Sequence, residues 1–302
     1  MDQMVAVHDI YEPKTGTWQY VVADPSTMSA AVIDSVLDFD PASATIDTKS
    51  ADALLALIQQ KKYTVELILE THAHADHLTA AAYLQEQLAS SQGSRPDIGI
   101  GKHIQEVQKR FGDRYGVNSI EYSNVFDRLF EDDAQFKIGN LNATVLYLPG
   151  HTPDHVGYRI QVSVDNGEDN IFCGDTLFNA DVGSARCDFP GGDATQLYHS
   201  VQKLLSHAPY VKIWTGHDYP PEARDGHAVS AMTVGQHREQ NKHLKDGTSE
   251  REFVAWRTER DATLKEPRLI HYALQMNIRA GRLPKPTPMG DRLLHVPLKG
   301  HF

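Results

Sequence analysis

The 302-residue sequence has little of several features that mark other classes of protein. It contains two cysteines, Cys173 and Cys187, which are too few for a disulfide framework and have no CxxC spacing. No stretch approaches the roughly 20 apolar residues that a membrane-spanning helix needs. The residues after Met1 show neither a secretory signal nor an Arg-rich transit pattern. We therefore expect a cytoplasmic protein without a membrane partner.

Positive charge is also scarce. The formal net charge is −11, and no run of basic residues offsets it. Because nucleic-acid binding needs a basic face, this composition argues against a nucleic-acid partner. The sequence has no internal repeat and no low-complexity tract, and its hydrophobic fraction of 40% can form a sizeable core. The length suits one large domain, or one domain with an extension.

The first part of the chain predicts a β-hairpin followed by a helix. Residues Trp18 to Ala23 and Ala30 to Ile33 have the composition of strands, with turn-forming residues between them. Leu54, Leu55 and Ile58 lie at helical spacing, which predicts a helix around residues 51–60.

Four later apolar runs are short and β-prone, and each leads into potential metal ligands. They are Val65 to Leu69 before His72, Ala143 to Leu148 before His151, Ile171 to Cys173 before Asp175, and Val211 to Trp214 before His217. In layered α/β proteins, ligands gather on the loops that leave one end of a sheet. These strand ends therefore predict a single shared site.

Helices are expected between these strands and in a C-terminal extension. The patterns predict helices over residues 78–88 and 197–205, the second with an apolar stripe. After about Pro220 two polar helical stretches follow, with Ser249 and Glu252 as a capping box. A basic, Pro-rich tail and a final apolar run end the chain. We expect a catalytic domain over residues 1–222 and an extension over residues 223–302 packed on it.

The segment His72-Ala73-His74-Ala75-Asp76-His77 carries the strongest chemical signal. Alternate residues at a strand end point the same way, so His72 and His74 can converge on one ion. Asp76 and His77 can face a second position nearby. Imidazole and carboxylate suit Zn, Fe and Mn, and the lack of thiolates disfavours a structural cysteine-based zinc site. A lone histidine is usually surface decoration, but this spacing followed by three more ligands predicts a metalloenzyme rather than a scaffold.

The order and spacing of four motifs resemble the metallo-β-lactamase superfamily. The motifs are THAHADH (residues 71–77), PGHT (149–152), GDTLF (174–178) and GHDY (216–219). The resemblance covers Trp18 to about Pro220 and implies an α/β fold, the αββα four-layer sandwich, here with a C-terminal helical extension. In binuclear members, His72, His74 and His151 would hold one metal, Asp76, His77 and His217 the other, and Asp175 would bridge them.

Narrower marks resemble the persulfide dioxygenase branch of this superfamily. They are RCDFPGG (residues 186–192) with LYHS (197–200), and MNIRAGRLP (276–284). This resemblance implies oxidation of glutathione persulfide by O₂ to sulfite, with one Fe(II) held by His72, His151 and Asp175. His74, Asp76, His77 and His217 would then orient these ligands.

The same branch implies that glutathione is contacted by Arg186, Asp188, Tyr219 and Arg279. A guanidinium can bind a carboxylate with two hydrogen bonds, which suits a substrate that carries two carboxylates. The alternative for Arg186 is an ion pair with Asp188 that only closes the loop.

One motif departs from the dioxygenase pattern. The sequence His151-Thr152-Pro153-Asp154-His155 resembles hydrolytic members instead. The alternative function is therefore a zinc-dependent hydrolase with one or two Zn(II), in which Asp76 orients the hydroxide that attacks a thioester, lactone or lactam. His155 is expected either to lie near the metal or to bond a backbone carbonyl. The dioxygenase motifs are longer and span two regions, so they favour oxidation.

A second copy of the chain, forming a homodimer, is a further expected partner.

Overall fold

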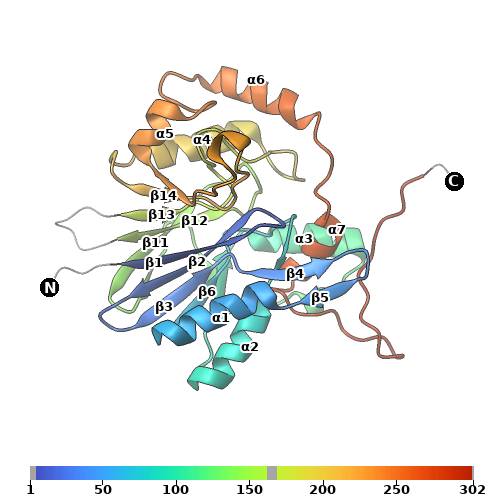
Figure 1. Ribbon diagram of the computed structural model, residues 1–302. Coiled ribbons are helices and arrows are strands. Elements are labelled where there is room, and N and C mark those ends of the chain that lie inside the picture. Colours follow the sequence, from blue (N-terminus) through green and yellow to red (C-terminus); the bar gives the residue numbers. More distant parts are fainter. Residues whose placement is uncertain (1–4, 162–168, 301–302) are drawn as a thin grey trace.

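The computed structural model describes residues 5–161 and 169–300. Two six-stranded sheets lie face to face, with helices on their outer sides (Figure 1). This is the four-layer αββα arrangement that the sequence motifs predict. None of the helices in these two ranges is both long enough and apolar enough to span a bilayer.

The first sheet has the strand order β1-β2-β3-β6-β8-β9. Strands β1 to β3 pair antiparallel, and β3, β6, β8 and β9 pair parallel. Its strands are β1 (Ala6–Glu12), β2 (Thr17–Asp24), β3 (Ser29–Ile33), β6 (Thr64–Leu69), β8 (Asp97–Gly101) and β9 (Arg128–Phe130). The predicted hairpin is β2 and β3, in register from Tyr20–Ile33 to Asp24–Ser29.

The second sheet has the order β10-β11-β12-β13-β14-β15. Its strands are β10 (Gln135–Ile138), β11 (Leu141–Tyr147), β12 (Val156–Gln161), β13 (Asn170–Phe172), β14 (Lys212–Trp214) and β15 (Ala231–Thr233). The four apolar runs that were predicted to be strands are β6, β11, β13 and β14, so one belongs to the first sheet and three to the second. A smaller sheet joins β5 (Thr45–Asp47), β4 (Val36–Asp40) and β7 (Leu78–Thr79).

The helices cover the two outer faces. On the first sheet lie α1 (Lys49–Lys61), α2 (Ala81–Gln92) and α3 (Ile104–Tyr115), and beside the second lie α4 (Ala194–Leu205), α5 (Val234–Gln240) and α6 (Glu250–Asp261) (Figure 1). Helix α7 (Ile270–Asn277) packs against α3 and β7. Short 3-10 turns occupy Ser119–Glu121 and Glu222–Arg224.

The core follows the two-residue alternation of the strands. In β2, Tyr20 and Val22 join the cluster between the two sheets, whereas Val21 joins the cluster beneath the helices. Both faces of the strand are therefore buried, which explains its apolar run from Tyr20 to Ala23. The predicted stripe of α4, including Leu197 and Val201, packs against the second sheet in a third cluster.

Helix α2 begins later than the sequence pattern predicts. Leu78 and Thr79 form strand β7 instead, paired with Leu37 and Val36 of β4. The backbone N–H of Thr79 donates to the side chain of Asn277 at 2.9 Å, so a partner distant in sequence holds this segment extended. The predicted capping box of Ser249 and Glu252 is present at the start of α6.

Residues beyond 222 are closely joined to the rest of the protein. Strand β15 pairs antiparallel with β14 and so completes one edge of the second sheet. Helix α6 packs on α4. The division at residue 222 stays a prediction.

Candidate metal centre

The candidate ligands lie on loops that follow β6, β11, β13 and β14. His72, His74, Asp76 and His77 follow β6 of the first sheet, and His151, Asp175 and His217 follow strands of the second. These loops meet where the two sheets face each other. The structure therefore brings all seven predicted residues together.

Two glycines allow the loops to approach this closely. Gly174 has a φ of +49°, a left-handed conformation that glycine adopts without steric cost. At Gly216, an added Cβ would lie 2.4 Å from Asp175 Oδ1. Each glycine directly precedes a candidate ligand. The absence of a side chain at these two positions therefore lets the ligand loops lie close together.

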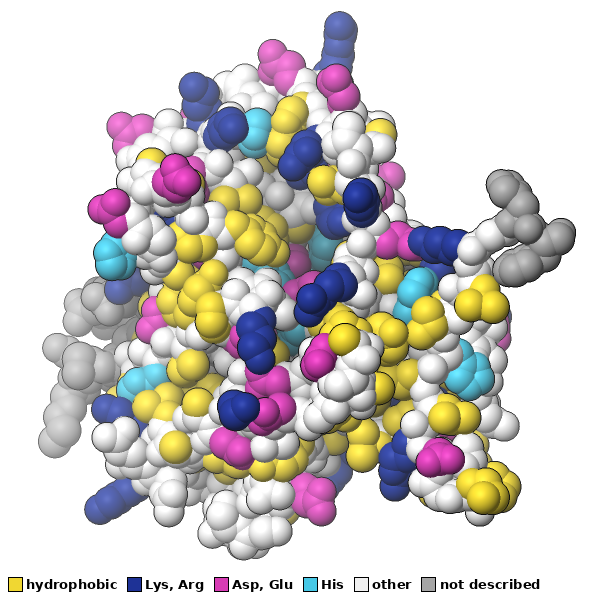
Figure 2. Space-filling model, turned by 45° about the vertical axis from the view of Figure 1, so that its right-hand side comes forward, with side chains coloured by type: hydrophobic (Ala, Val, Ile, Leu, Met, Phe, Trp, Pro, Cys, Tyr) yellow, Lys and Arg dark blue, Asp and Glu magenta, His cyan; other side chains and the backbone are white. Residues whose placement is uncertain are grey.

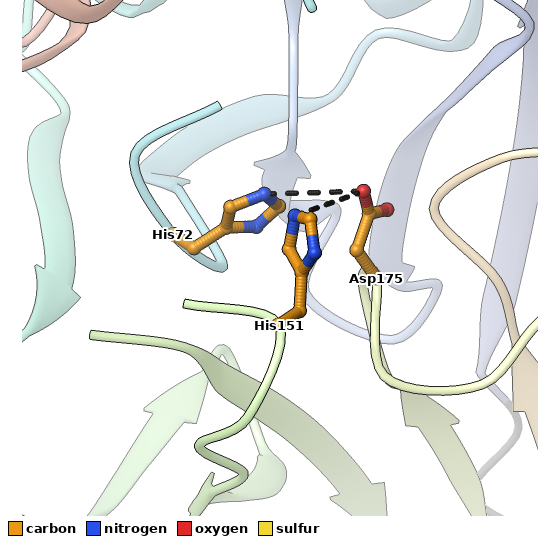
Figure 3. Close-up of side chains that lie close together, drawn as sticks. All are labelled: His72, His151 and Asp175. Atoms are coloured by element: carbon orange, nitrogen blue, oxygen red, sulfur yellow. Dashed lines mark ion pairs between the residues drawn. The ribbon is translucent and has the colours of Figure 1, made fainter. Parts of the chain in front are cut away.

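One cluster consists of His72, His151 and Asp175 (Figure 3). Asp175 Oδ2 lies 4.0 Å from His72 Nε2 and 3.6 Å from His151 Nε2. Two ligands that each lie about 2.1 Å from one ion are separated by roughly 3–4 Å. All three side chains are buried. The spacing therefore suits a shared metal ion.

A second cluster consists of His74, Asp76 and His77, with His217 beside it. Asp76 Oδ2 lies 3.2 Å from His77 Nδ1 and 3.3 Å from His217 Nε2. His217 Nε2 also lies 3.4 Å from Asp175 Oδ2, so Asp175 stands between the two clusters. The ligand atoms therefore form two adjacent groups, each of which could hold an ion.

Hydrogen bonds fix the ring nitrogens of the first cluster. His151 Nδ1 donates to the carbonyl oxygen of Arg186 at 2.6 Å, which leaves a lone pair on Nε2. His72 Nδ1 lies 3.0 Å from Thr71 Oγ1, which itself donates to Asp34. Both histidines thus present Nε2 toward Asp175. Such outer contacts are a common feature of metal-binding histidines.

Asp34 and Glu70 were not among the predicted site residues. His74 Nε2 lies 3.1 Å from Asp34 Oδ1 and 3.2 Å from Glu70 Oε2. Both contacts use Nε2, so Nδ1 is the ring nitrogen of His74 that remains for a metal ion. Both carboxylates directly follow buried strands, β3 and β6, so the strand-end rule that identified the ligands would also have identified them.

The fit to a metal is tested by buried atoms that lack partners. Among the described residues, His72 Nε2, His74 Nδ1, His77 Nε2 and Asp175 Oδ1 are buried and have no hydrogen-bond partner. An unsatisfied buried polar atom costs about 1–3 kcal/mol, so four such atoms across the two adjacent clusters indicate a site that binds a cation. The donor set of imidazoles and carboxylates suits zinc or iron.

The electrostatics of the site also favour a cation. Burial lowers the pKa of His217, but the carboxylates of Asp175 and Asp76 outweigh this effect and raise the pKa to about 9. Burial, together with the neighbouring His74, holds the pKa of His72 well below its usual value. His72 is therefore neutral, and its free lone pair can act as a ligand.

His155 lies beneath the first cluster. Its Nε2 accepts a hydrogen bond of 2.9 Å from the backbone N–H of Asp175, and its ring stacks on that of His72. Burial lowers the pKa of His155 to about 3, so the ring is neutral and can accept. The expected bond to a backbone carbonyl is wrong, because the partner is an amide N–H.

The C-terminal extension supports the first ligand loop. Asn277 Nδ2 donates to the backbone carbonyl oxygens of His74 and His77 at 2.8 and 2.9 Å. Asn277 belongs to the MNIRAG motif, and its side chain is buried. This part of the motif therefore positions ligands.

A cavity of about 760 Å³ opens onto the cluster and is lined by Asp76, His151, Asp175 and His217 at its metal end. Figure 2 shows a hollow with histidine and acidic side chains at its bottom and Lys and Arg side chains along its edge. This volume suits a small-molecule substrate.

The predicted substrate-binding residues are placed differently from one another. Arg186 and Tyr219 line the cavity, and Tyr219 is 53% exposed and stacks on His217. Arg186 binds Asp188 at 2.5 Å, which is the ion pair expected as its alternative role. Arg279 is 4% exposed, pairs with Glu121 at 3.1 Å and is not among the residues lining this cavity. The geometry therefore gives Arg279 a structural partner.

The sequence profile of the metallo-β-lactamase superfamily matches residues 14–217. The chain belongs to this superfamily. It is 41% identical to a protein of Burkholderia pseudomallei named "probable metallo-hydrolase", over 97% of this chain and 99% of that one. It is also 41% identical to "glyoxylase B2" of Dictyostelium discoideum, over 95% of this chain and 94% of that one.

More distant relatives carry a different enzyme name. The mitochondrial "persulfide dioxygenase ETHE1" of Bos taurus is 28% identical to this chain. The similarity covers 94% of this chain and 91% of the bovine protein. The crystal structure of ETHE1 from Myxococcus xanthus superposes with a TM-score of 0.70 at 24% identity, covering 92% of this chain and 100% of that one. These comparisons establish the fold and a superfamily of enzymes, with a His/Asp cluster suited to metal binding.

Proposed function

We propose that this protein is a metal-dependent dioxygenase that oxidises glutathione persulfide. The reaction is GSSH + O₂ + H₂O → GSH + SO₃²⁻ + 2 H⁺. His72, His151 and Asp175 would hold one Fe(II) ion, which supplies the redox chemistry for O₂, and this two-histidine, one-carboxylate set is typical of non-haem iron oxygenases. The observation that carries the proposal is the convergence of these three side chains (Figure 3).

Two further observations support oxidation. Arg186, the first residue of the RCDFPGG segment, lines the cavity, and its backbone carbonyl fixes His151. The 28% identical persulfide dioxygenase spans nearly the whole chain, so the likeness includes the extension. Asn277 of that extension holds the loop of His74 and His77 in place.

The residues of the chain have distinct tasks in this proposal. Asp34 and Glu70 orient His74, whereas His155 orients both His72 and Asp175. Fixed ligands keep the substrate sulfur and O₂ in one arrangement, which lowers the entropic part of the barrier. The candidate ligands other than Asp76 are buried, and the lower effective dielectric around them strengthens the electrostatic interactions between them.

The alternative is a zinc-dependent hydrolase of a thioester, lactone or lactam. The second cluster of His74, Asp76 and His77 favours it, because a binuclear site needs these groups. The names of the two 41% identical relatives point the same way. In this alternative one or two Zn(II) would bind, and Asp76 would orient the attacking hydroxide.

Oxygen uptake distinguishes the two functions. Iron-loaded and zinc-loaded protein are each given glutathione persulfide, and O₂ and sulfite are measured together. The proposal predicts one sulfite for each O₂ consumed, with the iron-loaded protein only. No uptake by the iron form, with cleavage of a glutathione thioester by the zinc form, would overturn it.

A cytoplasmic location and a homodimer stay predictions.

A further inference from the structure

The positive side chains that line the cavity are not equivalent. Arg186, Lys242, Arg257 and Arg260 all border it. Asp188 neutralises Arg186 at 2.5 Å, and the buried carboxylate of Asp261 neutralises Arg257. These two guanidinium groups already have carboxylate partners and are less available to a ligand.

Lys242 and Arg260 differ from them. Neither forms an ion pair with any residue in 5–161 or 169–300, and both side chains are exposed. Arg260 Nη1 makes a single long hydrogen bond of 3.4 Å, to the hydroxyl of Thr263. The cavity thus has two uncompensated positive charges. Its lining carboxylates, Asp76 and Asp175, belong to the metal cluster.

Ring packing brings together the two segments that carry these cations, and both side chains line the cavity. His243, next to Lys242, stacks on Trp256 with ring centroids 3.5 Å apart. Trp256 lies one helical turn before Arg260 on α6, so the two share a face of the helix. This wall lies outside residues 14–217, the segment that matches the superfamily profile.

We infer that Lys242 and Arg260 bind carboxylate groups of the substrate and so select an acidic thiol derivative over a neutral one. The cavity then has two functional ends: the His/Asp cluster takes the reacting sulfur, and the cationic wall takes the carboxylates. Charge-assisted hydrogen bonds to carboxylates are stronger than neutral ones. The identity of the ligand as a glutathione derivative rests on the proposed function, but selection by charge applies equally to a persulfide and a thioester.

Binding of S-methylglutathione, an unreactive analogue, tests this inference without turnover. The metal-loaded protein is titrated calorimetrically in the absence of O₂. We expect Lys242→Met and Arg260→Met each to weaken binding about 10–100-fold, since a lost hydrogen bond to a charged group costs about 1.5–3 kcal/mol. A double variant combines Lys242→Met with Arg260→Met. The dimethyl ester of the analogue should bind the unmodified protein as weakly as the free acid binds this double variant.

The matched control is Arg251→Met, an exposed arginine of the same helix that does not line the cavity. It should leave binding unchanged, and melting temperatures verify that all variants fold. Cavity variants that bind the analogue as tightly as the unmodified protein would overturn the inference. Charge-dependent binding without O₂ uptake would contradict only the proposed oxidation, so the two failures are distinguishable. In turnover, the cavity variants should raise KM and leave kcat within about twofold.

Discussion

The side-chain amide of Asn277 donates a hydrogen bond of 2.8 Å to the backbone carbonyl of His74, 203 residues away in the sequence. The same amide binds the carbonyl of His77 and accepts from the N–H of Thr79. One buried side chain therefore fixes three backbone groups of the first ligand loop. This contact ties the C-terminal extension to the metal centre.

Asn277→Ala should destabilise the protein and weaken metal binding. Three buried backbone groups would lose their partner, and each loss costs about 1–3 kcal/mol. We expect the free energy of unfolding to fall by about 3 kcal/mol or more, measured by denaturant titration of the metal-free protein. Gln240→Ala removes an exposed amide and is the control. A metal-free Asn277 variant of unchanged stability would show that the extension does not support the loop.

A pair of substitutions at His155 separates its acceptor role from its packing. His155→Phe keeps an aromatic ring against His72 but cannot accept the N–H of Asp175, whereas His155→Gln keeps an acceptor. We expect the phenylalanine variant to lose about 10–100-fold in metal affinity, as is usual for residues that orient ligands. The glutamine variant should lose less. Metal competition titrations measure both, and equal affinities would contradict this role.

Asp175→Ala should abolish activity by either proposed mechanism. Asp175 Oδ2 lies within 4.0 Å of the Nε2 atoms of His72, His151 and His217, so its removal opens both clusters at once. We expect O₂ uptake and thioester cleavage to fall by more than about 100-fold. Asp225→Ala, at an exposed turn, is the control. An Asp175 variant with full activity would mean that the site is elsewhere.

The pH dependence of stability should contain a contribution from His237, which is distant in sequence from the ligands. Burial lowers the pKa of His237 to about 4 in the folded protein. The unfolded chain therefore binds more protons between the two pKa values, and stability falls as the pH drops from about 6.5 toward 4. This contribution is about 2 kcal/mol between pH 7 and pH 5. His237→Gln should show a correspondingly shallower loss in denaturant titrations, and an unchanged loss would contradict it.

The convergence of the candidate ligands can be predicted from the sequence because its signals are local. His72, His151, Asp175 and His217 each follow a short apolar run, and those runs are strands β6, β11, β13 and β14. The strand-end rule does not depend on knowing which sheet each strand joins. It therefore locates the candidate ligands without knowledge of the two-sheet arrangement.

The supporting contacts were harder to predict because they join segments that are distant in sequence. No local pattern near Asn277 indicates that its amide binds His74, and Leu78 and Thr79 form a strand because of that packing. The ion pair of Arg186 with Asp188 joins residues only two positions apart, and the sequence analysis includes it as the alternative to substrate binding. That Lys242 and Arg260 have no carboxylate partner within residues 5–161 and 169–300 is visible only in three dimensions.

The central claim is that His72, His151 and Asp175 bind a common metal ion. Anomalous diffraction from crystals of the iron-loaded or zinc-loaded protein tests it most directly. We predict an ion about 2.0–2.2 Å from His72 Nε2, His151 Nε2 and a carboxylate oxygen of Asp175. An ion bound away from these three side chains, or no ion at full metal loading, would contradict the claim.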